Sequence, residues 1–348
     1  MRKKYNLETA LFETTARCNF NCIFCGSDCK SELNPEELSV PEWRAIVDDL
    51  AGLGAKRIIL SGGEPTLKEG VGDLAIHINS RGIQWGMVSN GFSIPQDFLR
   101  VMERCKPYAI GLSIDGKEET HNKLRGNSRS FQRVSESIKK FQEREIPISV
   151  ITTVHKANFY ELSAIASFIL EKRIYGWQIQ LAMPFGRMGE RRELLLSQEE
   201  FFELCIFVET VRKFMPFVNI AAADCFAWAS ARKIRDGRWP GCGGGVDAVG
   251  IDSLGNVRGC LSMTGCEPES NIREKSLAEI WNDPNLFQYN RRFSRKNLSE
   301  SCRQCDKVLV CKGGCNSQSF SMTGKFQQGI YCWYGSRKER REQSGNGL

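Results

Sequence analysis

The chain has 348 residues, 41% of them hydrophobic, and a formal net charge of +7. This length suggests two domains rather than one, and no apolar run reaches the roughly 18 residues that a membrane span needs. The basic residues are dispersed, and their densest run, from Arg337 to Arg341, includes Glu339. We therefore expect a solvated tail and no nucleic-acid-binding surface, while an acidic substrate or leader peptide stays open.

The N-terminus and the cysteine content indicate the compartment. Glu8 and Glu13 interrupt the region after the basic N-terminus, and no apolar h-region or small-residue cleavage site follows. We expect no signal peptide and hence a cytoplasmic protein. Because cytosolic thiols stay reduced, the 15 cysteines indicate metal or redox chemistry rather than disulfides.

Up to about residue 215, short apolar runs alternate with amphipathic segments. The expected strands are 11–15, 57–60, 84–89, 109–114, 148–154 and 178–181. The expected helices include 40–52, which a Ser39/Glu42 capping box opens, and 130–144, 158–172 and 198–214. Six strand–helix units predict a parallel α/β architecture. Since six units are too few to close an eight-stranded barrel, we expect a partial (β/α)6 barrel with its functional groups after the strand C-termini.

From about residue 216 the helical periodicity fades, and glycine and cysteine become dense. Residues 251–257 resemble a hairpin and residues 276–282 a short helix. We expect cysteine ligation to replace part of the hydrophobic core here. The sequence therefore predicts domains at 1–215 and 216–336 and a frayed polar tail at 337–348.

Three cysteines lie directly after the first predicted strand. Cys18, Cys22 and Cys25 have the spacing Cys-x3-Cys-x2-Cys. Soft thiolates at such spacing can wrap one loop around a cubane iron–sulfur cluster. Three ligands leave one iron open to an exogenous ligand. A zinc site with Cys29 as the fourth ligand is the alternative.

This segment resembles the motif of the radical S-adenosylmethionine (SAM) superfamily. Phe24 matches the aromatic residue common before the third cysteine. The resemblance implies that the open iron binds SAM. It also implies that the reduced cluster cleaves SAM to a 5′-deoxyadenosyl radical, which abstracts a substrate hydrogen. The cofactor supplies this chemistry, while the protein positions it and excludes water.

The loops after the following strands are expected to bind SAM. Gly62, Gly63 and Glu64 stand in a Gly-Gly-Glu-Pro turn, where glycines permit close backbone approach and Glu64 offers an acceptor to an ammonium. The turn is similar to the family segment that binds the SAM amino group. Further expected SAM contacts, each with a solvated loop residue as the alternative, are Asn90, Ser113 and Arg125. We expect residues 183–187 either to line the adenine-binding part of the SAM site or to pack in the core.

A second array is similar to the seven-cysteine SPASM domain, and the whole resemblance covers roughly residues 10–335. Its spacing is Cys-x12-Gly-x4-Cys, then Cys-x2-Cys-x5-Cys-x3-Cys, then one last cysteine. These cysteines are Cys242, Cys260, Cys302, Cys305, Cys311, Cys315 and Cys332. The alternative is a zinc ribbon built on the Cys-x2-Cys pair.

By that resemblance the array holds two auxiliary [4Fe–4S] clusters, which makes three clusters in all. One cluster would take Cys302, Cys305, Cys311 and Cys332, and the other Cys242, Cys260 and Cys315. The eighth ligand is left open between Cys225, Cys266 and an exogenous group. An electron donor such as flavodoxin or ferredoxin is implied as a partner.

Three functions are compatible with these motifs. The first is modification of a ribosomally made peptide. Since about seventeen residues precede Cys18, we expect a separate leader-peptide-binding protein or a direct docking surface. The second is modification of a small molecule such as a tetrapyrrole, an aminoglycoside or a quinone precursor. The third, a non-catalytic electron carrier, is disfavoured because a carrier needs no SAM site.

The proton acceptor is not identified by the sequence. Anaerobic sulfatase-maturing enzymes carry an aspartate directly after the Gly-x4-Cys cysteine, where this chain has Leu261, so that activity is disfavoured. The open candidates for a base are Asp252, Asp306 and Tyr334.

Overall fold

The computed structural model of the chain describes residues 5–32, 34–223, 225–226, 241–336 and 338. Apart from Lys338, the predicted tail at 337–348 lies outside the described residues. No helix in the described ranges is long and apolar enough to cross a bilayer.

Seven parallel strands form a curved, open sheet. They pair in chain order as β1 (Thr9–Glu13), β2 (Arg57–Ser61), β3 (Gln84–Ser89), β4 (Ile110–Ser113), β5 (Ile148–Val154), β6 (Gly176–Leu181) and β7 (Asn219–Ala222). The predicted partial barrel is confirmed, and β3 and β5 have the predicted bounds. The strand β7, which the sequence did not predict, extends the sheet beyond β6.

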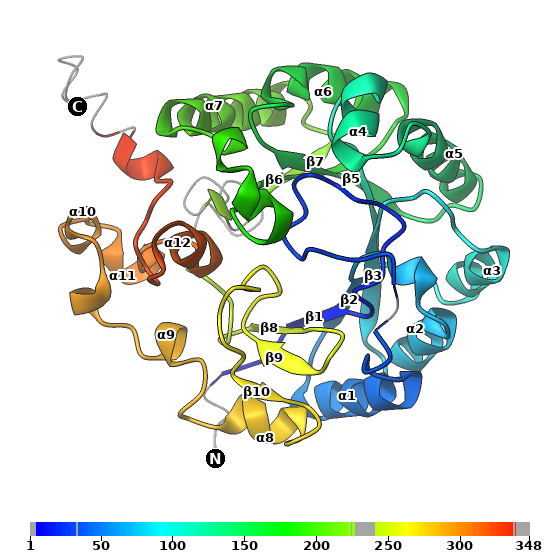
Figure 1. Cartoon of the computed structure of the whole chain (residues 1–348), viewed down its shortest axis with the longest axis horizontal. Helices are drawn as coiled ribbons and strands as arrows, with labels where there is room; N and C mark the ends of the chain where they lie inside the picture. Colours follow the sequence, from blue (N-terminus) through cyan, green and yellow to red (C-terminus); the bar gives the residue numbers. More distant parts are fainter. Residues whose placement is uncertain (1–4, 33, 224, 227–240, 337, 339–348) are drawn as a thin grey trace.

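Helices cover the outer face of this sheet (Figure 1). They are α1 (Val40–Leu53), α2 (Val71–Ser80), α3 (Gln96–Arg104), α4 (Glu118–Arg125), α5 (Ser130–Gln142), α6 (Leu162–Glu171) and α7 (Gln198–Phe214). Short 3-10 turns lie between them, namely η1 (Pro65–Leu67), η2 (Phe159–Glu161), η3 (Gly186–Glu190) and η4 (Arg192–Leu194). The predicted capping box of α1 is present: Ser39 accepts from the Glu42 N–H, and the Glu42 carboxylate accepts from the Ser39 N–H.

The alternation of β1 separates the core from the interior of the barrel. Ala10 and Phe12 are fully buried, and Phe12 packs on Trp43 of α1 with a centroid distance of 4.6 Å. Successive strand residues point to opposite faces. The last residue of β1, Glu13, therefore points to the concave inner face.

The cysteine-rich region continues the same sheet. Strand β8 (Ala248–Ile251) pairs in parallel with the free edge of β1, and β9 (Asn256–Arg258) returns antiparallel to β8 as the predicted hairpin. A short strand, β10 (Ser270–Asn271), ends the ten-stranded sheet. The domain division at residue 216 stays a prediction, but the two parts share one sheet.

The remaining C-terminal elements are short. They are α8 (Leu277–Asn282), α9 (Gln288–Arg291), η6 (Arg295–Asn297), α10 (Glu300–Arg303), α11 (Val308–Cys311) and α12 (Asn316–Thr323). In Figure 1, α9 to α12 lie between the β10 edge and α7. Tyr331 stacks on Phe201 of α7 at 4.9 Å, and Trp333 packs on Phe202 at 4.7 Å. The C-terminal segment thus covers the side that the open barrel leaves uncovered.

One arginine joins the N-terminus to this region. The Arg291 guanidinium lies 4.5 Å from the Tyr5 ring, 4.7 Å from the Trp281 ring and 4.6 Å from the Phe287 ring. It also donates to the backbone oxygens of Gly245, Asp283 and Trp281. Burial lowers the pKa of Arg291.

Replacing Arg291 is expected to destabilise the C-terminal region. Arg291→Ala removes hydrogen bonds from a charged donor and the cation–π contacts, so we expect a loss of about 2–4 kcal/mol. The neighbouring Arg292 is exposed, and Arg292→Ala serves as the control. Thermal unfolding of cluster-loaded protein measures both. Equal unfolding temperatures for the two variants would contradict this role of Arg291.

Candidate functional site

The predicted ligands lie on one long loop between β1 and α1, which we call the cysteine loop (residues 14–38). In Figure 1 its dark-blue trace crosses the inner side of the barrel. Cys18 and Cys29 are buried with Phe20, and Cys22 and Cys25 pack partly buried against them. The structure thus brings the three predicted ligands together.

Burial and hydrogen bonds shift the pKa values of these thiols in different directions. Burial raises the pKa of Cys18 to about 11 and also raises that of Cys22. A hydrogen bond from the Cys29 thiol lowers the pKa of Cys25 to about 5. Buried thiols become thiolates when a metal binds them, so the donor set suits a soft iron–sulfur cluster.

The spacing of the cysteine side chains distinguishes a site for one metal ion from a site for a cluster. Among the described residues, no three histidine, cysteine, aspartate or glutamate side chains converge closely enough to hold a single metal ion. A cubane spreads its thiolate ligands over several iron atoms and needs a wider ring of sulfur than one zinc ion. The grouped cysteines are compatible with the wider arrangement.

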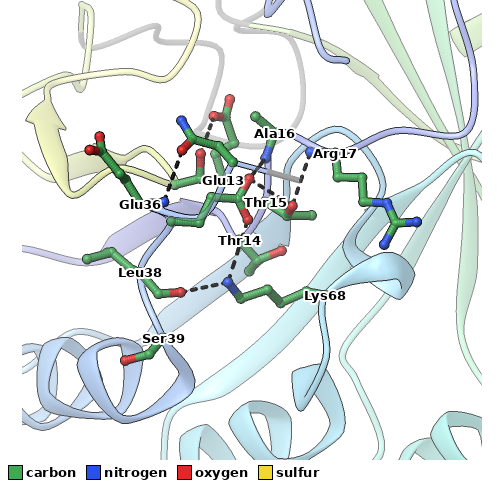
Figure 2. A network of polar contacts seen from close by, with 12 residues as sticks. Glu13, Thr14, Thr15, Ala16, Arg17, Glu36, Leu38, Ser39 and Lys68 are labelled. Carbon is green, nitrogen blue, oxygen red and sulfur yellow. Dashed lines mark hydrogen bonds and ion pairs between the residues drawn. The ribbon is translucent and has the colours of Figure 1, made fainter. Parts of the chain in front are cut away.

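A buried carboxylate ties both ends of the cysteine loop together, and Figure 2 labels its neighbours Thr15, Ala16 and Lys68. Glu37 accepts from the Thr15 hydroxyl at 3.0 Å and from the Ala16 N–H at 2.7 Å. Its other oxygen lies 3.6 Å from the Lys68 ammonium, which donates to the Leu38 carbonyl at 2.6 Å. The sequence analysis missed Glu37 and Lys68, because isolated charged residues in loops carry no signal that separates a buried clamp from a solvated side chain.

The Gly-Gly-Glu-Pro turn packs directly on the backbone of the cysteine loop. The Gly63 N–H donates to the Thr15 carbonyl at 2.8 Å, and the Glu64 N–H donates to the Arg17 carbonyl at 2.9 Å. A Cβ on Gly63 would lie 2.3 Å from the Arg17 oxygen, and one on Gly62 would lie 2.4 Å from the Thr15 oxygen. Both glycines are therefore required for loop packing, whatever they bind.

Glu64 joins the β2 and β3 loops. It is 1% exposed, and burial raises its pKa. Its carboxylate accepts from the Thr66 N–H and hydroxyl, from the Ser89 hydroxyl and from the Asn90 N–H. Asn90 in turn donates to the Asn19 side chain at 2.8 Å. Glu64 and Asn90 thus orient the cysteine loop through internal contacts.

The helix α4, which follows β4, places Arg125 against the aromatic residue of the cysteine motif. Arg125 lies over the Phe24 ring at 5.6 Å and pairs with the fully buried Asp115 at 2.6 Å. Burial disfavours its charge, but Asp115 and Cys22 outweigh this and raise its pKa. Ser113, also buried, makes a 3.4 Å contact to a β3 carbonyl. All six predicted SAM residues therefore lie around the cysteine loop, five of them on loops or at a strand end and Arg125 at the end of α4.

Arg187, after β6, holds the cysteine loop from the opposite side. Its guanidinium donates to the Cys22 carbonyl at 2.8 Å, to the Cys29 carbonyl at 3.0 Å and to Asp28 at 2.9 Å. The backbone N–H of Arg187 donates to the Cys25 carbonyl at 3.0 Å. The sequence placed this segment near adenine or in the core, and only the structure reveals its backbone contacts to the cysteine loop.

The C-terminal cysteines fall into two groups. Burial, followed by the neighbouring thiolates of Cys332, Cys302 and Cys305, raises the pKa of Cys311 to about 12. These four residues are the set expected for one auxiliary cluster.

The second group surrounds Cys315. Burial, followed by Cys242, Cys225 and Cys260, raises the pKa of Cys315 well above its usual range. Cys266 lies apart from Cys315 on the β9 side, where Arg258 donates to its carbonyl. Of the two candidates for an eighth ligand, Cys225 interacts with Cys315, and Cys266 interacts with Cys260 of the same group.

The three candidate bases have other partners. Asp252 accepts from the Leu254 N–H and from the N–H and side chain of Asn256. Asp306 and Tyr334 bind each other near the surface at 2.9 Å.

Comparisons with known proteins agree with this geometry. Residues 12–169 match the family model of the radical SAM superfamily, and residues 242–306 match that of the SPASM iron–sulfur cluster-binding domain. The chain is 26% identical to an AdoMet-dependent heme synthase of Methanosarcina barkeri, over 93% of this chain and 95% of the relative. It is 24% identical to a PqqA peptide cyclase of Bradyrhizobium diazoefficiens, over 90% of this chain and 82% of the relative.

Two solved structures share the fold. Streptococcus suis SuiB bound to S-adenosylmethionine has a TM-score of 0.77 at 19% identity, covering 94% of this chain and 76% of SuiB. The protein anSMEcpe with bound AdoMet has a TM-score of 0.74 at 18% identity, covering 97% of each chain.

A methyl group at Gly63 is expected to displace the cysteine loop. In Gly63→Ala the Cβ overlaps the Arg17 carbonyl oxygen, and such overpacking costs about 1–3 kcal/mol. We expect lower iron retention and a lower unfolding temperature. Gly52→Ala is the control, because a Cβ there meets nothing within 4 Å. Iron analysis and thermal unfolding measure both variants, and a Gly63→Ala protein that matches the control would overturn this packing argument.

Proposed function

The chain belongs to the radical SAM superfamily and carries a SPASM domain, and from this membership we propose that it modifies a ribosomally made peptide. SAM and more than one [4Fe–4S] cluster are the cofactors of such an enzyme. SAM bound to a reduced cluster supplies a 5′-deoxyadenosyl radical, which removes a hydrogen atom from the substrate. The residues of the chain bind, orient and shield these groups.

The observation that carries the proposal is the cysteine loop itself. Cys18, Cys22 and Cys25 are the ligands that we propose for the SAM-binding cluster. Phe20, Phe24 and Phe92 surround their thiols and exclude water. Hydrogen bonds from the β2 and β6 loops fix the backbone that presents these thiols, and Asn90 of the β3 loop binds the Asn19 side chain. Such preorganisation is what a site that controls a radical requires.

We assign the SAM pocket to the concave side of this loop. Gly62 and Gly63 present backbone groups there, while Glu64 and Asn90 orient the turn. Ser113 and Arg125 complete the pocket from β4 and the helix after it. The auxiliary clusters take Cys302, Cys305, Cys311 and Cys332 on one side and Cys242, Cys260, Cys315 and Cys225 on the other. We also propose a cytoplasmic location and an electron donor of the flavodoxin or ferredoxin class.

Several proteins similar to this chain act on or bind peptides, and this favours a peptide substrate over a small molecule. PqqA peptide cyclases are among the relatives, and the structural neighbours include SuiB bound to precursor peptide SuiA and anSMEcpe bound to peptides. A separate leader-binding protein would recruit the peptide. The second candidate is a tetrapyrrole, because the heme synthase relative is matched over almost its whole length.

SAM cleavage tests the assignment of the radical cluster. The triple variant Cys18→Ala, Cys22→Ala, Cys25→Ala is expected to make no 5′-deoxyadenosine, while its iron falls by about one third because one cluster of three is lost. Cys105→Ala, in a helix C-cap away from the array, is the control. Chromatography of reactions with dithionite and SAM measures the product. Continued 5′-deoxyadenosine formation by the triple variant would refute the assignment.

The substrate class is decided by mass spectrometry. The reduced wild-type protein is incubated with SAM and either a short peptide encoded beside its gene or an iron-bound coproporphyrin. A mass change in the peptide supports the proposal. A change confined to the porphyrin supports the second candidate and contradicts the first.

A further inference from the structure

Glu13 is a carboxylate on the concave face, and none of the roles assigned above to the cysteine loop or the SAM pocket accounts for it. Its neighbour Phe12 packs outward on Trp43, so Glu13 points inward at the carboxyl end of β1. The side chain keeps partial exposure. A molecule in the interior of the barrel can therefore contact Glu13.

Glu13 lies where the barrel meets the cysteine-rich region. The β8–β9 turn begins beside it, and the Ser253 hydroxyl lies 3.4 Å from its carboxylate. The acidic groups that face it are Asp252 from this turn, and Cys25 and Cys29 from the cysteine loop. On the β2 side its partner in register is Ser61, which does not titrate. Glu13 thus lies between the radical-generating loop and the region that leads to Cys260.

Other carboxylates near this face have their charge compensated. Asp115 is paired with Arg125. Glu64 accepts four hydrogen bonds from its own loops. Asp252 accepts three hydrogen bonds and lies 3.7 Å from Arg258. Among the residues that the structure describes, Glu13 accepts hydrogen bonds from Ser253, through its N–H and its hydroxyl. A carboxylate can accept about four hydrogen bonds, so Glu13 retains the capacity to accept a proton or a donor from a ligand.

The electrostatics agree with this placement. Burial, then the charge of Asp252, raises the pKa of Glu13 to about 7. A general base works best when its pKa lies near the working pH. Glu13 can therefore take up a proton at neutral pH and release it again.

We propose that Glu13 contacts the substrate and accepts the proton that it loses after hydrogen abstraction. This inference rests on the proposed function, because it requires a substrate bound on the concave face. The 5′-deoxyadenosyl radical takes one hydrogen atom from a substrate C–H bond and becomes 5′-deoxyadenosine. The substrate radical then loses one electron to an oxidised iron–sulfur cluster and one proton to the Glu13 carboxylate. Two electrons and two protons have left the substrate, and the Glu13 carboxylic acid returns its proton to solvent.

The first experiment needs no substrate. Infrared spectra of cluster-loaded protein are recorded from pH 5 to pH 9 for wild type, Glu13→Gln and Glu36→Gln. Glu36 is exposed and serves as the control. We expect a protonated-carboxyl band that disappears as the pH rises through about 7, is missing in Glu13→Gln and is kept in Glu36→Gln. If the band that disappears through about pH 7 is as strong in Glu13→Gln as in wild type, the proposal is overturned.

The second experiment uses the peptide encoded beside the gene, deuterated at the carbon that loses hydrogen. We expect Glu13→Gln to keep SAM cleavage and deuterium transfer to 5′-deoxyadenosine within about twofold. Product formation should fall by about 100-fold, the usual range for a lost general base. Glu13→Asp retains a carboxylate and should recover part of the product. In wild type the product rate should rise with pH through about 7, because only the carboxylate accepts a proton.

The outcomes separate this inference from the function on which it rests. Wild-type protein that modifies no peptide contradicts the proposed function, and the infrared titration still decides whether Glu13 exchanges a proton. Wild-type turnover with equal product from Glu13→Gln contradicts the role of Glu13 alone. Loss of both deuterium transfer and product in Glu13→Gln and Glu13→Asp would indicate a structural role and would also overturn the proposal.

Discussion

Backbone hydrogen bonds to the cysteine loop are the constraint on which the rest of the site depends. The loop is too long to hold three thiols in place by its own turns, and carbonyls at Thr15, Arg17, Cys22 and Cys25 accept from groups on the β2 and β6 loops. Parallel strands bring their carboxyl ends to one edge of a sheet. The partial barrel therefore supplies the donors at the place where the loop needs them.

The continuous sheet explains how two kinds of cluster can serve one substrate. Strand β8 pairs with the edge of β1, the strand that leads into the cysteine loop. The hairpin that precedes Cys260 is thereby fixed relative to Cys18 and its neighbours. The C-terminal segment also packs on α7 through Tyr331. A substrate held on the concave face would thus meet the radical on one side and a route for electrons on the other.

The sequence predicted the repeated features of this fold. Periodicity placed six strands and the bounds of α7, and the capping rule located the start of α1. The spacing of the cysteines pointed to iron–sulfur ligation, and the division into ligand sets, which the family resemblance implies, stays a prediction. The sequence did not predict β7, whose four residues carry too short a pattern, or the pairing of β8 with β1. That pairing joins residue 9 to residue 248, and no local pattern encodes it. Glu37 was missed because its partners Thr15 and Lys68 lie far from it in sequence, and the contacts of Arg187 to the cysteine loop were missed because they are mostly to backbone atoms.

We propose that three thiols leave one iron open, to which SAM binds. Pulsed electron–nuclear double resonance of the reduced, cluster-loaded protein tests this proposal with SAM labelled with ¹⁵N in the amino group and ¹⁷O in the carboxylate. We expect hyperfine coupling of both labels to a [4Fe–4S]⁺ cluster, and no coupling when Cys18, Cys22 and Cys25 are replaced by alanine. Saturating SAM with neither label coupled to any cluster would contradict it.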